Sequence, residues 1–216
     1  KKTVTLYILL LALSIGVLFL LNLFLGSVDI PFRSIWNILW GMDEGESVIW
    51  QNIIWKSRVP QALTAMVAGA GLAVSGLQMQ TVFRNPLAGP SVLGISSGAS
   101  LGVAFVVLLS GSIGGIALSR LGFMGEIALT MAAIIGALSI MALIVYVSQK
   151  VHGNVTLLII GVMIGYVANA VIGVLKFFSV EEDIRAYVIW GLGSFARVSG
   201  NQMMVFVCIM AVLLPL

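Results

Sequence analysis

Apolar residues fill long uninterrupted runs of this chain, and polar residues gather in the joints between the runs. A helix rises about 1.5 Å per residue, so about 20 apolar residues cross a hydrocarbon layer roughly 30 Å thick. Runs that fit or approach this length cover residues 6–26, 62–83, 92–109, 127–148, 155–178 and 203–216. The pattern predicts an all-α fold, a polytopic transmembrane helical bundle with about six spans.

The first and last runs need separate interpretation. Lys1 and Lys2 precede the first run, as in a secretion signal, but the run is long and has no small-residue cleavage pattern after it. We therefore interpret it as a retained helix. The last run is too short for a full span, so we expect residues 1–216 to be the N-terminal part of a single transmembrane domain.

Composition excludes a water-soluble surface for this chain. Hydrophobic residues make up 60% of the sequence and charged residues only 9%, whereas soluble domains have about a quarter charged. The lipid bilayer is therefore the expected surrounding of the helices. The net charge of +3 comes from basic residues scattered singly along the chain, which argues against a nucleic-acid partner.

Two joints are amphipathic rather than merely polar. Joint 27–61 contains four tryptophans and an acidic cluster, and segment 181–195 mixes charged and aromatic residues. The residues concerned are Trp36, Trp40, Trp50, Trp55, Asp43, Glu44 and Glu46 in the first, and Asp183, Arg185, Tyr187 and Trp190 in the second. Indole rings favour the headgroup region, so we expect both segments at the membrane interface, along one face.

Small residues recur every fourth position in two of the runs. One set is Gly94, Gly98 and Gly102, and the other is Gly161, Gly165, Asn169 and Gly173. This spacing places each set on one helix face, where two backbones can approach closely, so we interpret both as packing faces. Asn169 is different, because an amide within a membrane either bonds to a neighbouring helix or faces a water-filled path.

The segment from Arg84 to Pro90 predicts a break between two spans. Pro86 and Pro90 remove amide donors and bias Asn85 and Gly89 away from helix. The residues that follow include Gly94, Ser96, Ser97 and Gly98. Irregular backbone at membrane depth has to be covered by protein or line a cavity, so the segment is either a substrate site or a tightly packed joint.

The chain offers no catalytic or metal-binding constellation, and we expect no cofactor. Cys208 and His152 are single residues of their type, and the phosphate-loop pattern G-x-x-x-x-G-K-[ST] is absent from the sequence. A membrane-embedded enzyme is therefore disfavoured. An ion- or proton-coupled carrier or channel stays the alternative, although charged residues are missing from the middle of the first five runs.

Several motifs in fixed order closely resemble the permease family of iron-siderophore, haem and cobalamin importers. They are Arg58-Val59-Pro60, the stretch from Ala68 to Gly76, Gln80, Arg84 to Pro90, Gly94 to Ala99 and, more weakly, Trp190 to Phe195. The resemblance is densest over residues 58–99. It implies the transmembrane subunit of an ATP-binding-cassette importer in the bacterial cytoplasmic membrane.

The resemblance also implies a subunit of ten helices that works by alternating access as a homodimer. The implied partners are two cytoplasmic ATPase subunits and an extracytoplasmic substrate-binding protein. The remaining spans and the loop that docks on the ATPase would lie beyond Leu216. The resemblance does not indicate which chelate is carried.

Specific residues acquire expected roles through this resemblance. Arg58 matches an arginine that meets a carboxylate of the binding protein, so we expect Arg58→Glu to weaken docking and leave folding intact. Gln61 departs from the family, which often has a second basic residue there. The pathway-lining or gating candidates are Gly161, Gly165, Asn169, Gly173, Trp190 and Ser194. A separate structural motif is expected at Asn85, Pro86, Pro90, Gly94, Ser96, Ser97 and Gly98.

The resemblance favours a cytoplasmic N-terminus, which places both amphipathic segments outside. With the N-terminus inside, the basic residues inside are only Lys1, Lys2, Arg84 and Lys150, and those outside are Arg33, Lys56, Arg58, Arg120, Lys176, Arg185 and Arg197. Lysine and arginine normally gather on the cytoplasmic side, so charge counting favours the inverse orientation. We keep the cytoplasmic N-terminus as the expectation.

Overall fold

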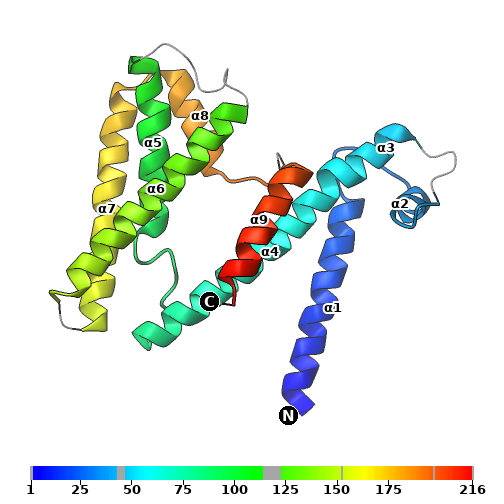
Figure 1. Cartoon of the computed structure of the whole chain (residues 1–216), viewed down its shortest axis with the longest axis horizontal. Coiled ribbons are helices and arrows are strands. Elements are labelled where there is room, and N and C mark those ends of the chain that lie inside the picture. The colour runs from blue at the N-terminus through cyan, green and yellow to red at the C-terminus, as the bar shows by residue number, and fades with distance from the viewer. Residues whose placement is uncertain (1, 43–46, 114–122, 152, 197, 216) are drawn as a thin grey trace. The chain divides into compact units, whose positions relative to one another are not determined.

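The computed structural model of the chain describes residues 2–42, 47–113, 123–151, 153–196 and 198–215. Every regular element in these ranges is a helix, which confirms the all-α prediction (Figure 1). The expectations that concern Lys1, Asp43, Glu44, Glu46, Arg120, His152 and Arg197 lie outside the described residues.

The helices follow one another along the chain with short joints. They are α1 (Lys2–Phe24), α2 (Phe32–Leu39), α3 (Val48–Ile53), the π-helix η1 (Ile54–Arg58), α4 (Val59–Phe83), α5 (Ile95–Ile113), α6 (Phe123–Ser148), α7 (Asn154–Phe178), α8 (Glu181–Gly191) and α9 (Gly200–Leu213).

Four stretches of helix are long and apolar enough to cross a membrane within the described residues: Thr3–Phe24, Val48–Phe83, Met124–Ser148 and Asn154–Phe178. They correspond to four of the six predicted runs. The other two runs contribute shorter apolar stretches among the described residues, Ile95–Leu109 within α5 and Gly200–Leu213 in α9. The apolar side chains of α1 are largely exposed, as expected of a helix whose solvent is lipid.

The predicted end of the first long joint at Gln61 is wrong, because helix runs without interruption from Val48 through Pro60 to Phe83. Proline has no N–H for the carbonyl four residues earlier and crowds that turn. The π-helical turn Ile54–Arg58 lies immediately before Pro60, which is fully buried. A π-turn is wider than an α-turn, so it accommodates the proline without ending the helix.

The described residues form two compact units. The first contains residues 1–71 and 194–216, and the second contains residues 72–193. The core of the first unit consists of Leu23, Ile30, Ile35, Ile38 and Ile54. The second unit has one core around Val103, Leu108 and Ile172 and another around Phe83, Leu93, Ile144 and Leu158.

Helices α5, α6, α7 and α8 pack together in the second unit (Figure 1). Gly98 and Gly102 of α5 lie directly against α6, where a Cβ on either would overlap the main chain of Gly136 or Ala132. The predicted packing role of these two glycines is thus confirmed. Their partners belong to a second series of small residues, Ala132 and Gly136, whose spacing of four was visible in the sequence but not recognised.

Candidate functional site

The irregular segment between α4 and α5 ends against the backbone of α7. Gly94 has φ +74°, and a Cβ there would lie 2.8 Å from the carbonyl oxygen of Gly161 and 3.1 Å from the amide nitrogen of Gly165. A Cβ on Gly161 would lie 2.9 Å from the Cα of Leu93. Both the backbone angle and the close approach therefore require glycine at position 94.

A cavity of about 210 Å³ opens beside this contact. It is lined by Ser91, Val92, Gly94, Ser97, Val162, Gly165, Tyr166 and Asn169. The lining offers neutral hydrogen-bonding groups: two hydroxyls, a phenol and an amide. Pockets that enclose small ligands usually measure about 300–1,000 Å³, so this cavity can receive part of a large ligand but not surround it.

Some predicted pathway residues border this cavity, and the others make different contacts. Gly165 and Asn169 border the cavity, next to Gly94 and Ser97 of the structural motif, and Gly161 lies just beyond it. Gly173 faces open space, and Trp190 packs against the core around Val103. The Ser194 hydroxyl accepts a hydrogen bond from the Ala196 amide at 3.0 Å within the other unit.

The motif between α4 and α5 is an ordered, packed segment. The amide of Leu87 donates to Asn85 Oδ1 at 2.9 Å, and Ala88 and Leu93 are buried beside Phe83. Pro86 is exposed at the tip, Pro90 is half-buried, and Ser96 is exposed on the first turn of α5. The first part of the segment thus forms a packed joint, and its end borders the cavity.

Helix α4 ends in a Schellman motif that carries an arginine in the left-handed region. Arg84 has φ +48°, its amide donates to the Thr81 carbonyl at 3.3 Å, and the Asn85 amide donates to the Gln80 carbonyl at 3.2 Å. Glycine is the usual residue at this position because it has no Cβ. The backbone of Arg84 is therefore strained, and its side chain is exposed, so no burial of that side chain offsets the strain.

Helix α8 is fixed to α5 and α7 through Tyr187. Burial raises the pKa of Tyr187, and a hydrogen bond with the Ser100 side chain partly offsets the rise. The Lys176 ammonium lies 4.8 Å from the centre of the Tyr187 ring, a cation–π distance. Ser100 and Lys176 belong to two other helices, so sequence spacing alone could not relate them to Tyr187.

Arg58 lies inside the first unit and is only 5% exposed. Its guanidinium donates to three backbone carbonyls: Leu23 at 2.5 Å, Phe24 at 3.2 Å and Val28 at 2.5 Å. A Cβ on Gly26 would lie 2.6 Å from the Arg58 Nη2, so the guanidinium occupies the space that a side chain at position 26 would need. We call Arg58, Gly26 and the three carbonyls the arginine clasp.

The arginine clasp changes what is expected of Arg58. A guanidinium that satisfies the last carbonyls of α1 and faces the negative end of its dipole ties α1 to the start of α4. The expectation that Arg58→Glu leaves folding intact does not agree with this burial. Docking through Arg58 stays a prediction. Gln61, three residues after Arg58, donates through its side-chain amide to the Ala196 carbonyl at 3.3 Å.

The chain matches described proteins along most of its length. Residues 11–216 match the FecCD transport family. The hemin transport system permease protein HmuU of Yersinia pestis is 35% identical over 182 residues, covering 84% of this chain and 51% of HmuU. The vitamin B12 import system permease protein BtuC of Serratia proteamaculans is 35% identical over 209 residues, covering 96% of this chain and 56% of BtuC.

A solved structure of a metal-chelate type ABC transporter in an inward-facing conformation has the same fold. The TM-score is 0.71 at 26% sequence identity, with 94% of this chain and 57% of the other covered. The chain thus spans about half the length of the curated relatives it matches. By its motifs, its all-helical fold and the match over residues 11–216, the chain belongs to the FecCD transport family.

Proposed function

We propose that the chain is part of the transmembrane subunit of an ATP-binding-cassette importer that carries an iron chelate, haem or cobalamin across the bacterial cytoplasmic membrane. The observation that carries the proposal is the family match over residues 11–216. The relatives named above are permeases for hemin and vitamin B12, which supports a large chelate as the substrate.

The proposed mechanism is alternating access along a path that passes α7. Two features of the second unit support this choice. The cavity beside Gly94 and Gly165 offers neutral polar groups, which suits a weakly selective wall for a bulky ligand. Close glycine contacts join α5 to α6 and α7, so these helices are expected to move as one body when the path changes its opening.

Hydrolysis of ATP is assigned to a separate subunit. The chain contains no phosphate-loop sequence of the type G-x-x-x-x-G-K-[ST]. By membership of the importer family, the proposed assembly contains a second copy of the permease, two cytoplasmic ATPase subunits and an extracytoplasmic substrate-binding protein. In this assembly the binding protein selects the ligand and the permease transmits it.

ATPase activity in a reconstituted system tests this assignment. The purified permease in lipid should hydrolyse no ATP by itself and should support hydrolysis when the ATPase subunit is added. Loaded binding protein should raise the rate further, since it engages the same assembly. A permease that hydrolyses ATP alone, with the activity following it through purification, would overturn the proposal.

A further inference from the structure

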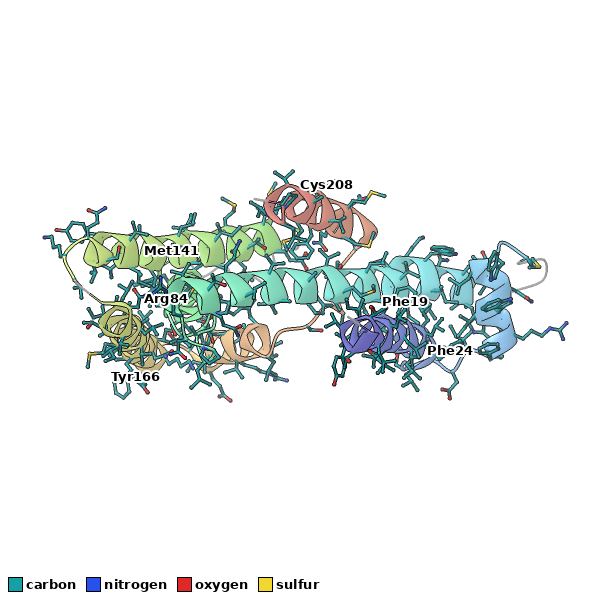
Figure 2. The ribbon with its side chains drawn as sticks, turned by 90° about the horizontal axis from the view of Figure 1, so that it is seen from below. Phe19, Phe24, Arg84, Met141, Tyr166 and Cys208 are labelled. Carbon is teal, nitrogen blue, oxygen red and sulfur yellow. The ribbon has the colours of Figure 1, made fainter. Side chains whose placement is uncertain are left out.

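Four aromatic rings form a continuous series from the end of α1 along α2: Phe24 is half-buried against the core, and the other three rings are exposed. The ring centres of Phe24 and Phe32 are 4.9 Å apart, those of Phe32 and Trp36 are 6.3 Å apart, and those of Trp36 and Trp40 are 5.8 Å apart. Figure 2 shows Phe24 at the end of α1 next to α2. We call Phe24, Phe32, Trp36 and Trp40 the aromatic ladder.

The ladder faces outward because the opposite side of α2 is anchored in the core. Ile35 and Ile38 are buried against Leu23, Ile30 and Ile54. In contrast, Phe32 and Trp40 are each 64% exposed and Trp36 is 46% exposed. Residues four apart lie on one helix face, so Phe32 and Trp36 of α2 and Trp40 at its C-cap form a single stripe of exposed rings.

The position of the ladder along the chain places it at the boundary of the hydrocarbon layer. Helix α1 has 23 residues and is about 35 Å long, close to the thickness of a bilayer core. Phe24 is its last residue, so the first ring of the ladder lies where the span leaves the hydrocarbon. The apolar exterior of α1 extends to this end of the helix, where Leu21 and Leu25 are exposed on either side of Phe24.

The chemistry of this face fits the lipid interface. Phenyl and indole rings at this depth can keep their faces against acyl chains while indole N–H groups reach water. Arg33 is exposed, and a helical step of about 100° from Phe32 places it beside the ladder on α2. A guanidinium at this rim can bind a lipid phosphate.

We propose that the aromatic ladder binds the headgroup and glycerol region of the phospholipid bilayer. This binding fixes the depth of the end of α1 in the membrane and does not depend on substrate or partner subunits. Continuity with the exposed surface of α1 favours lipid over a soluble protein. Because the arginine clasp holds the carbonyls of Leu23 and Phe24, the ladder and the start of α4 are held at one depth.

Depth-dependent fluorescence quenching tests the proposal on the permease in phosphatidylcholine vesicles. The chain has five tryptophans, so a variant that keeps only Trp36 has Trp40→Phe, Trp50→Phe, Trp55→Phe and Trp190→Phe. Lipid brominated near the carbonyl end of its chains should quench Trp36 at least about twofold, and lipid brominated deeper should quench it less. The matched control keeps only Trp50, which packs against the core of the same unit and should be quenched less.

Three results would overturn the proposal. Quenching of Trp36 by aqueous acrylamide but not by brominated lipid would place the ladder in water or against a soluble partner. Protection from both quenchers would mean that protein covers it, and stronger quenching by the deeper bromines would place it among acyl chains. If the multiple variant does not fold, Trp36→Phe in the native chain should remove part of the lipid-quenchable emission, and an unchanged quenchable fraction would contradict the proposal.

Discussion

Arg58 is a cation buried among backbone carbonyls at the end of a membrane-length helix. Burying a charge is costly unless hydrogen bonds replace its hydration. Three carbonyls and the negative end of the α1 dipole supply this replacement. The same bonds satisfy carbonyls that a helix end leaves without intrahelical donors, so the interaction serves both partners.

Replacing Arg58 should therefore destabilise the fold. Arg58→Met leaves buried carbonyls without a donor, and we expect the free energy of unfolding to fall by about 2–4 kcal/mol. The measurement is denaturant unfolding in mixed micelles. Lys56→Met is the matched control, because Lys56 is exposed in the same π-turn and its loss should change stability by under about 0.5 kcal/mol.

The structural role and the docking role of Arg58 predict different unfolding curves for Arg58→Met. If Arg58 acts only in docking, Arg58→Met unfolds like the wild type and binds the substrate-binding protein more weakly. Unfolding curves that coincide with those of the wild type would contradict the arginine clasp.

Arg84 offers a second test at the residue scale. Its φ of +48° suits glycine, so we expect Arg84→Gly to raise the free energy of unfolding by about 0.5–1 kcal/mol. Arg84→Ala keeps a Cβ in the same strained conformation and should leave stability nearly unchanged. A stability loss in the glycine variant would mean that the arginine side chain makes a stabilising contact.

These two arginines also show the limit of sequence reasoning about sites. The motif around Arg58 directed attention to the right residue, but its acceptors are carbonyls up to 35 positions away, and carbonyls carry no sequence signal. Of the residues that line the cavity, Gly94, Ser97, Gly165 and Asn169 were candidates from the sequence, whereas Ser91, Val92, Val162 and Tyr166 were not. Gly165 and Asn169 lie four apart on one helix, and their position beside Gly94 follows from the close backbone contact that glycine permits.

At the scale of elements, apolar run length predicted the long helices well because hydrocarbon thickness fixes that length. It placed the start of the second span too late. The predicted span began at residue 62, whereas the π-turn before Pro60 lets the helix continue from Val48. Local proline rules do not reveal a widened turn, because its stability comes from the buried neighbours Ile54 and Arg58.

The contact between α5 and α6 supplies the prediction at this scale. A Cβ on Gly136 would overlap the carbonyl of Gly98, so Gly136→Ala should force the two helices apart and cost about 1–3 kcal/mol. Gly76→Ala in α4 is the control, since no atom beyond its chain neighbours and the backbone of its own helix lies within 4 Å of a Cβ there. The control should be neutral or gain up to about 1 kcal/mol in unfolding free energy, from helix propensity.

At the scale of the whole molecule, two sequence arguments disagree about orientation in the membrane: the resemblance favours a cytoplasmic N-terminus, and charge counting favours the inverse. Single cysteines in a Cys208→Ala background can decide it. We expect Met42→Cys and Leu192→Cys, both at exposed positions, to react with a membrane-impermeant maleimide in intact cells. Gln149→Cys, in the exposed joint after α6, should react only after the membrane is permeabilised. The reverse pattern would invert the predicted topology.

Transport itself is the most direct test of the proposed function. The measurement is uptake of labelled haem, cobalamin and ferric chelates into proteoliposomes that contain the permease with its ATPase subunit and binding protein. We expect one of these ligands to accumulate only with ATP and binding protein present, and we expect a hydrolysis-deficient ATPase subunit to abolish uptake. Accumulation driven by a proton or sodium gradient without ATP would contradict it and would favour a secondary carrier.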